Sequence, residues 1–280
     1  MKGKLARTLT CCALTLLIAG LLPSRANAWG AEGHQIVAGI AEKFLKAHSP
    51  QTLLKAQKLL GGKSLVSVAT FADDVRSKRQ YTKNWHFVDI PLGEDSYNAA
   101  RDCKTVKKGD CAIQALARFG AVLADTSEDD CIRAEALKFI IHIVGDMHQP
   151  LHNVDDDDAG GNGKTVRFFE LKGFGDNPPN LHGVWDEGII DHSKMSVQQF
   201  IDALTPADDP GNVSLSPVVW AQESHVLAQQ AYGRLPSPDA DGVYILDKDT
   251  SYFDDGLPVV KTQLAKGGVR LAKALILALG

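Results

Sequence analysis

The segment from Phe139 to Asp146 constrains this chain most, because it reads Phe-Ile-Ile-His-Ile-Val-Gly-Asp and is apolar on nearly every side. A helix with apolar residues all round lies in the interior of a protein. His142 and Asp146 are four residues apart and therefore share one face of that helix. A buried carboxylate without a partner costs several kcal/mol. The fold must therefore supply either a structural His–Asp hydrogen bond or a metal ion.

Further His and Asp residues favour the metal. His152 follows just past the end of the predicted helix, and His182 and Asp186 repeat the four-residue spacing. Upstream, Asp73 and His86 stand beside apolar residues. Two His-x₃-Asp pairs with additional His and Asp residues suit zinc, which takes nitrogen and carboxylate oxygen ligands at ~2.0–2.2 Å.

Most of the chain has the apolar periodicity of helices. An N-cap at Ser127 begins the helix that carries His142, and this helix must end near Pro150. Thr165 to Leu171 is the one strand signal, with room for a small β-hairpin. We expect a mainly α-helical single domain with few strands. The other predicted helices span residues 32–48, 53–60, 65–75, 112–123, 197–204, 217–232 and 259–279.

The first 28 residues have the layout of a secretory signal peptide. Basic residues precede an apolar core from Cys11 to Leu22, and Ala26-Asn27-Ala28 fits a cleavage site. The apolar core is shorter than the ~20 residues that span a bilayer, so a membrane anchor is the weaker interpretation. We expect a signal peptide at 1–28, a single domain at 29–280, and a secreted or periplasmic protein that begins at Trp29 and has no stable membrane association.

The charge balance excludes one simple class of protein. Removing the four basic residues of the predicted signal peptide changes the formal net charge from −4 to −8. A net-acidic protein does not look like a passive nucleic-acid binder, which shows a basic face. Bound divalent cations would change the local sign of the charge and could attract an anionic substrate.

Three cysteines remain after the predicted signal peptide. In an exported protein, Cys103 and Cys111 are candidates for a disulfide that closes a short loop. Cys131 would then be unpaired, as a small buried thiol. The alternative is that Cys131 pairs with one of the other two.

The motifs together resemble the zinc-dependent, single-strand-specific nuclease and 3′-nucleotidase family of the mung bean nuclease type, which belongs to the superfamily of zinc-dependent phospholipase C. The resemblance covers essentially all of residues 29–280 and implies a mainly α-helical fold. Its motifs are Trp-Gly-x-x-Gly-His at 29–34, Ala-Asp-x-x-Arg at 72–76, His-Phe-x-Asp at 86–89, His-x-x-Gly-Asp-Met-x-Gln-Pro-Leu-His at 142–152, Gly-Gly-Asn at 160–162 and Leu-His-x-x-Trp-Asp at 181–186.

The resemblance implies a cluster of three zinc ions, which could activate a shared water. A new amino terminus at Trp29 would provide both its amine and its carbonyl oxygen as ligands. The implied ligands are Asp73, His86 and His142 for one ion, Trp29 and His34 for the second, Asp146 as the bridge between these two, and His152, His182 and Asp186 for the third.

The resemblance also implies roles in catalysis and substrate binding. Asp73 would orient the attacking water, and Arg76 would neutralise charge on the phosphoryl oxygens. Phe87 would stack on an unpaired base while Asp89 binds the edge of that base. Asn162 would approach the phosphate. The simpler alternatives are that Phe87 is a core residue and that Asn162 lies in an ordinary turn.

The implied substrates are single-stranded DNA and RNA, cleaved to 5′-phosphates, and 3′-nucleotides. The sequence leaves the oligomeric state open, and a monomer is the default expectation. A zinc-dependent phospholipase C is the main competing interpretation, but its last ligand is typically Glu where this chain has Asp186. A non-catalytic zinc-binding protein is the other, although a closed structural site would not need Arg76. His148 is a weaker candidate for a tenth ligand.

Overall fold

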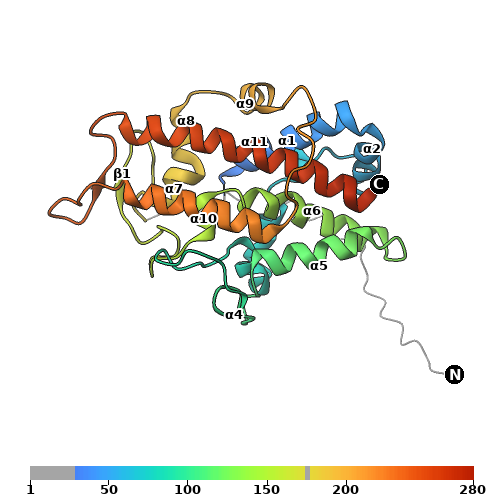
Figure 1. Ribbon diagram of the computed structural model, residues 1–280, viewed down its shortest axis with the longest axis horizontal. Coiled ribbons are helices and arrows are strands. Elements are labelled where there is room, and N and C mark those ends of the chain that lie inside the picture. Colours follow the sequence, from blue (N-terminus) through green and yellow to red (C-terminus); the bar gives the residue numbers. More distant parts are fainter. Residues whose placement is uncertain (1–28, 174–176) are drawn as a thin grey trace.

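The computed structural model describes residues 29–173 and 177–280, and the predicted signal peptide at 1–28 lies outside the described residues. The described chain is mainly α-helical, as expected (Figure 1). Its α-helices are α1 (Ala31–His48), α2 (Pro50–Leu59), α3 (Phe71–Arg76), α4 (Ala99–Asp102), α5 (Ala112–Ala124), α6 (Asp130–Asp146), α7 (Leu181–Gly183), α8 (Ile189–His192), α9 (Val197–Leu204), α10 (Pro217–Gly233) and α11 (Ser251–Leu279). Shorter elements are the 3₁₀ helices η1 (Val66–Val68), η2 (Gln80–His86) and η3 (Pro150–Asn153), the π-helix η4 (Val184–Gly188), and the strands β1 (Val166–Arg167) and β2 (Tyr244–Ile245).

Helix α6 lies at the centre of the domain. Its residues from Phe139 to Asp146 are all buried, as the apolar pattern predicted. Helices α1, α5 and α11 pack around it, and α11 crosses the whole domain in Figure 1. A Cβ atom on Gly268 of α11 would lie 2.4 Å from a methyl group of Ile40 in α1, so only glycine allows the two helices to pack this closely. The ends of α1 and α6 are thereby fixed where the candidate ligands lie.

Several predicted helix bounds were wrong. The helix predicted at 65–75 is divided into η1 and α3, and α2 begins at Pro50 rather than at residue 53. The N-cap of α6 is Asp129, whereas the Ser127 hydroxyl donates to Asp125. Helix α11 begins at Ser251, earlier than the predicted start, and contains Pro258. Its extra turns are held by packing, because Tyr252 is buried and its hydroxyl contacts the indole of Trp185. Tertiary contacts thus outweigh the local preference for a helix start at proline.

The predicted β-hairpin was also wrong. Strand β1 falls within the predicted strand, but it pairs with β2 in parallel, with Val166 opposite Tyr244. A hairpin joins neighbouring antiparallel strands, whereas β1 and β2 come from distant parts of the sequence. This short pairing ties the segment after the 154–163 loop to the segment that precedes α11.

The disulfide between Cys103 and Cys111 is present, which confirms the expected pairing. Cys131 lies outside this disulfide and is exposed at the start of α6, so the expectation of a buried thiol was wrong. Among the described residues, no helix is both long enough and apolar enough to span a membrane.

Candidate metal centre and active site

Separate elements bring eight predicted ligands into one buried region. The final turns of α6 carry two of them, and the others come from the first turn of α1, from α3, and from the ends of η2, η3 and the α7–η4 helix. We divide them into the Asp146 group and the Asp186 group. The Asp146 group consists of His34, Asp73, His86, His142 and Asp146, and the Asp186 group consists of His152, His182 and Asp186.

The carboxylate of Asp146 is the centre of the first group. Its Oδ1 atom lies 3.3 Å from His34 Nε2. Its Oδ2 atom lies 2.9 Å from His86 Nδ1 and 3.4 Å from His142 Nε2. All these side chains are completely buried. One carboxylate therefore serves three imidazoles that come from three different elements.

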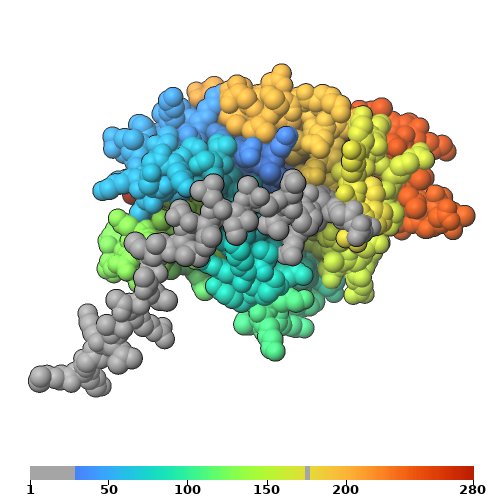
Figure 2. All heavy atoms as spheres, turned by 180° about the vertical axis from the view of Figure 1, so that it is seen from behind, coloured from blue at the N-terminus to red at the C-terminus, as the bar shows by residue number. Residues whose placement is uncertain are grey.

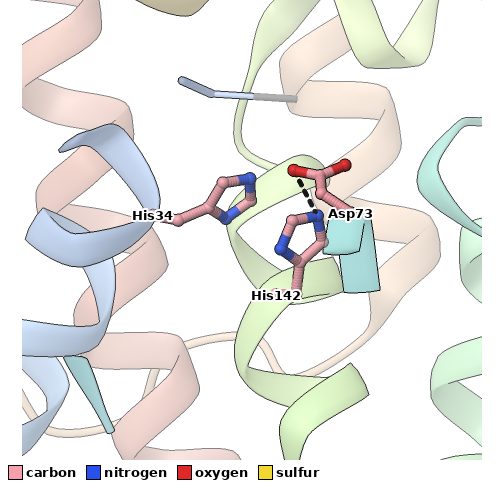
Figure 3. Close-up of side chains that lie close together, drawn as sticks. All are labelled: His34, Asp73 and His142. Atoms are coloured by element: carbon pink, nitrogen blue, oxygen red, sulfur yellow. Dashed lines mark ion pairs between the residues drawn. The ribbon is translucent and has the colours of Figure 1, made fainter. Parts of the chain in front are cut away.

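Asp73 completes this group from α3. Figure 3 shows His34, Asp73 and His142 converging from α1, α3 and α6. The Oδ2 atom of Asp73 lies 3.6 Å from His142 Nε2, and the rings of His34 and His142 stack with centroids 3.7 Å apart. These three residues form one possible cation site, while His86, His142 and Asp146 form another. The two sets overlap at His142, whose Nε2 lone pair can bind an ion in only one of them at a time.

The Asp186 group is smaller and takes His152 from η3, His182 from α7 and Asp186 from η4. His182 Nε2 lies 3.3 Å from Asp186 Oδ2, and His152 Nε2 lies 3.8 Å from Asp186 Oδ1. The two histidine Nε2 atoms are only 3.1 Å apart. Their ligand atoms, with one from Asp186, are close enough to hold a single ion.

The hydrogen bonds of the histidines fix which nitrogen faces the centre. In three of them the Nδ1 atom faces a backbone carbonyl at 2.7–2.8 Å: His142 faces Ala69, His152 faces His86, and His182 faces Gly160. A carbonyl only accepts, so Nδ1 donates and Nε2 is the nitrogen that keeps a lone pair. The lone pairs of His152 and His182 therefore point toward each other, an arrangement that a shared cation would stabilise. Such backbone support is typical of metal-ligating histidines.

Several oxygens of the buried carboxylates have no hydrogen-bond donor in the part of the chain that the structure describes. Both oxygens of Asp73, Oδ1 of Asp146 and Oδ2 of Asp186 have no hydrogen-bond partner among the described residues. Burial raises the pKa values of Asp73 and Asp186 well above their usual range. Burial likewise lowers the pKa values of His86 and His142 to about 3. A divalent cation would offset both penalties, and this set of nitrogen and carboxylate ligands fits zinc.

The ninth predicted ligand, Trp29, lies against the same centre. Its side chain is fully buried, and its indole N–H donates to the carbonyl of Gly145, the residue before Asp146, at 2.8 Å. The amide of Gly30 donates to the carbonyl of Asp186 at 2.9 Å. A Cβ atom on Gly33 would lie 2.7 Å from Trp29 Cβ, so only glycine at this position lets the side chain of Trp29 pack against the first turn of α1. The backbone around Trp29 is thus fixed between the Asp146 and Asp186 groups.

Gln149 is a supporting residue to which the sequence analysis gave no role. Its amide donates to Asp186 Oδ1 at 2.5 Å, and its carbonyl oxygen accepts from the Leu151 amide at 2.5 Å. This leaves Asp186 Oδ2 as the oxygen without a hydrogen bond. Its position as a polar residue between the predicted ligands Asp146 and His152 was the signal that could have identified Gln149.

The neighbouring His148 does not join the centre. Its Nδ1 donates to the carbonyl of Val144, and its Nε2 accepts from the Arg270 guanidinium at 3.0 Å. Both ring nitrogens are therefore occupied away from the ligand groups, and the buried Arg270 also pairs with Glu223. His148 and Arg270 hold the end of α6 rather than an ion.

A pocket of about 560 Å³ opens beside the centre. It is lined by three predicted substrate contacts, by Arg76, and by His182 of the Asp186 group. The Arg76 guanidinium lies 5.1 Å above the ring of Phe87, which is half-buried and faces the pocket. The segment between η2 and α4 (teal) and the 154–163 loop (yellow-green) both appear on the face drawn in Figure 2. The three predicted contacts are Phe87, Asp89 and Asn162.

Asn162 lies at the pocket, as the substrate-contact prediction requires, and also in a turn, as the simpler alternative proposed. It lines the pocket, and its side chain donates to the carbonyl of Ala159 at 2.8 Å. Ala159, Gly160 and Gly161 all have positive φ angles, so Asn162 follows a tight left-handed turn. The turn is what brings its side chain to the rim of the pocket.

A buried His and Asp centre beside a pocket that contains the ring of Phe87 is the arrangement expected of a metal-dependent hydrolase. Comparison with known proteins gives the family: the chain belongs to the S1/P1 nuclease family, whose model matches residues 29–280. It is 33% identical to endonuclease 4 of Arabidopsis thaliana over 94% of this chain and 91% of that protein. It is 31% identical to nuclease S1 of Aspergillus oryzae, over 95% and 96% of the two chains, and 30% identical to nuclease P1 of Penicillium citrinum, over 87% and 95%. The protein is an endonuclease, and these relatives support that function over a phospholipase C.

Proposed function

We propose that the protein is a zinc-dependent nuclease that cleaves single-stranded DNA and RNA to 5′-phosphates and also dephosphorylates 3′-nucleotides. The observation that carries this proposal is the convergence of histidine side chains with carboxylate oxygens that lack hydrogen bonds to described residues, beside the pocket that contains Phe87. Zinc bound there would activate water for attack and neutralise charge on the phosphoryl group. An unpaired base and its phosphate would then lie across the pocket and the centre together.

The proposed zinc count is three. The Asp186 group offers one set of ligand atoms, whereas the two sets of the Asp146 group overlap at His142. The proposal therefore divides the Asp146 group differently, with Asp73, His86 and His142 on one ion and His34 on the other. In this assignment Asp146 bridges two ions, and the amine and carbonyl of Trp29 complete the ion that His34 holds. The buried position of Trp29 supports this assignment, because its indole donates to Gly145 and the amide of the next residue, Gly30, donates to Asp186. The assigned ligands are Trp29, His34, Asp73, His86, His142, Asp146, His152, His182 and Asp186.

The catalytic roles follow from position. Asp73 has two carboxylate oxygens without hydrogen bonds, one of which could accept a proton from the attacking water. Arg76 reaches the pocket from the end of α3 and would neutralise charge that develops on the phosphoryl oxygens. No described side chain has to act as a covalent nucleophile in this scheme.

The preference for single strands follows from the pocket. Phe87 presents a ring to it, and stacking on such a ring is worth ~1–3 kcal/mol per base. A base inside a duplex offers no free face, so it cannot reach Phe87 without unstacking. Asp89, exposed at the pocket rim, would bind the edge of the stacked base.

Processing and localisation are part of the proposal. Cleavage between Ala28 and Trp29 would release a secreted or periplasmic enzyme, which we expect to act as a monomer. The family match begins at residue 29, which supports this position for the start of the domain.

The deciding experiment compares three substrates with the processed protein: a single-stranded oligonucleotide, its duplex, and a phosphatidylcholine emulsion. We expect rapid cleavage of the single strand to 5′-phosphates, loss of that activity on chelation, and about three zinc ions per chain by elemental analysis. Phe87→Leu should raise KM for the single strand, whereas Phe119→Leu, which removes a ring in α5 that packs against Phe139, is the matched control. Cleavage of the lipid, or equal rates on single strand and duplex, would contradict the proposed function.

A further inference from the structure

The two rims of the pocket carry opposite charges. Arg76 and Lys83 line the side formed by α3 and η2, whereas Asp155 and Asp157 line the side formed by the 154–163 loop. A nucleic-acid strand has one negative charge on every phosphate. A strand that places one base over Phe87 must therefore direct its other phosphates toward the basic rim and away from the acidic one.

A third cation extends the basic rim beyond the pocket. The amide of Asn84, next to Lys83, donates to the carbonyl of Lys108 at 2.9 Å, so the two segments lie side by side. Burial lowers the pKa of Lys83, and the nearby charges of Lys108 and Arg76 lower it further. These charges are thus close enough to repel one another. Cations gathered in this way favour an anionic ligand that spans them.

The cations of the basic rim differ from the neighbouring arginines in that no described residue holds them in an ion pair. Arg79 pairs with Glu135, Arg101 pairs with Glu94 and Asp102, and Arg118 pairs with Asp110. Among the described residues, no ion pair neutralises Lys83, Lys108 or Arg76. In a chain of net charge −4, these three positive charges next to the pocket therefore remain available for phosphates.

An exposed aromatic residue lies on the same surface. Tyr81 is 55% exposed and packs edge-to-face against Trp85. The carbonyl of Tyr81 and the indole of Trp85 both approach Gly109, the residue after Lys108. Cations interleaved with an aromatic ring are typical of surfaces that bind single-stranded nucleic acid without base preference.

We infer that Lys83, Lys108 and Tyr81 form a second binding surface, which holds the nucleotides that flank the cleaved one. The lysines would bind the neighbouring phosphates, and Tyr81 would stack on a neighbouring base. This inference rests on the proposed function, because it requires the cleaved nucleotide to lie over Phe87 and the ligand groups. It makes the enzyme prefer long strands to short ones.

The test compares a dinucleotide, which has only the scissile phosphate, with a strand of about twelve nucleotides. For Lys83→Gln combined with Lys108→Gln, we expect KM for the long strand to rise about tenfold relative to KM for the dinucleotide. The slope of log kcat/KM against log salt for the long strand should become less negative by about 0.7 for each lysine removed. Tyr81→Ser should raise the same KM ratio without changing the salt slope, whereas Tyr81→Phe should preserve the ratio.

The controls separate the possible failures. Lys63→Gln removes an exposed lysine outside the pocket and should leave both the ratio and the slope as they are. Lys83→Arg with Lys108→Arg should restore the preference for the long strand, and zinc content should be the same in every variant. An unchanged ratio and slope in the double Gln variant, or an equal loss on both substrates, would overturn the inference. If the unmodified protein cleaved neither substrate, the proposed function would fail instead.

Discussion

The Asp146 group and the Asp186 group use the same residue types but are supported differently. Asp146 lies within 3.4 Å of three imidazoles, and its Oδ1 atom has no hydrogen bond. Asp186 instead has one oxygen held by the Gln149 amide and the other left open. The first group thus depends on one shared carboxylate, whereas the second depends on a side chain that orients its carboxylate. If the proposed zinc assignment is correct, damage to the first group should remove more than one ion, and damage to the second only one.

The largest effect should come from Asp146→Asn. The amide keeps the shape of the side chain but loses the negative charge that faces three imidazoles and that, in the proposed assignment, bridges two ions. We expect zinc content to fall from three to about one per chain, and activity to fall by roughly 10⁴-fold, as when a group that acts in a catalytic unit is lost. Elemental analysis and single-strand cleavage would measure both. A variant that keeps three ions would show that Asp146 does not bridge.

A residue added before Trp29 should damage only the Asp146 group. It converts the proposed amine ligand into an amide, which cannot bind zinc in the same way. We expect the loss of one ion and a fall in activity of about 100-fold or more, while the Asp186 group keeps its ion. Removal of the extra residue by a site-specific protease should restore both, and full activity before that cleavage would contradict the amine assignment.

Gln149→Leu should damage only the Asp186 group. Without the amide, Asp186 is free to rotate and its Oδ1 atom is left buried without a donor. We expect affinity for one zinc ion to fall about 10- to 100-fold, the usual cost of losing a residue that orients a ligand. Titration with a competing chelator would resolve this single weakened ion from the other two. Gln229→Leu, which removes an amide that donates to the backbone of residues 92 and 94, is the matched control, and equal weakening in both variants would contradict a specific role for Gln149.

The smallest effect concerns the metal-free protein in acid. Burial lowers the pKa values of His86 and His142 to about 3 and that of His182 to about 4, whereas in the unfolded chain they titrate near 6.5. Below pH 6.5 these histidines bind more protons in the unfolded state, so they lower the free energy of unfolding as pH falls toward 4. The raised pKa values of Asp73 and Asp186 act in the opposite direction and offset part of this slope. Each such histidine contributes a slope of ~1.4 kcal/mol per pH unit.

Denaturant unfolding between pH 4.5 and 6.5, with and without zinc, would measure this slope. His182→Gln should reduce the slope of the unfolding free energy against pH by the contribution of one histidine. His142→Gln should reduce this slope by the same amount, and the reduction should continue to lower pH because the pKa of His142 is lower. An unchanged slope in both variants would show that these histidines are not held neutral.

The sequence predicted the centre of the fold better than its edges. The apolar run of α6 and the four-residue spacing of His142 with Asp146 and of His182 with Asp186 are local patterns, and both pairs lie within 3.4 Å. The parallel pairing of β1 with β2 joins distant segments that have no matching local signal. The extra turns of α11 depend on the packing of Tyr252, and the role of Gln149 depends on where Asp186 lies in space. Periodicity reports which face is buried, but not what that face meets.

The disulfide between Cys103 and Cys111 also has a consequence for redox conditions. The disulfide closes the loop that carries Lys108. Ala112 directly follows Cys111, and its backbone amide donates to the carbonyl of Phe87. No residue of the two ligand groups lies in this loop. Reduction would therefore loosen the lysine that extends the basic rim and leave the metal ligands in place. If Lys108 binds flanking phosphates as inferred, a thiol-rich environment should reduce the preference for long strands over short ones.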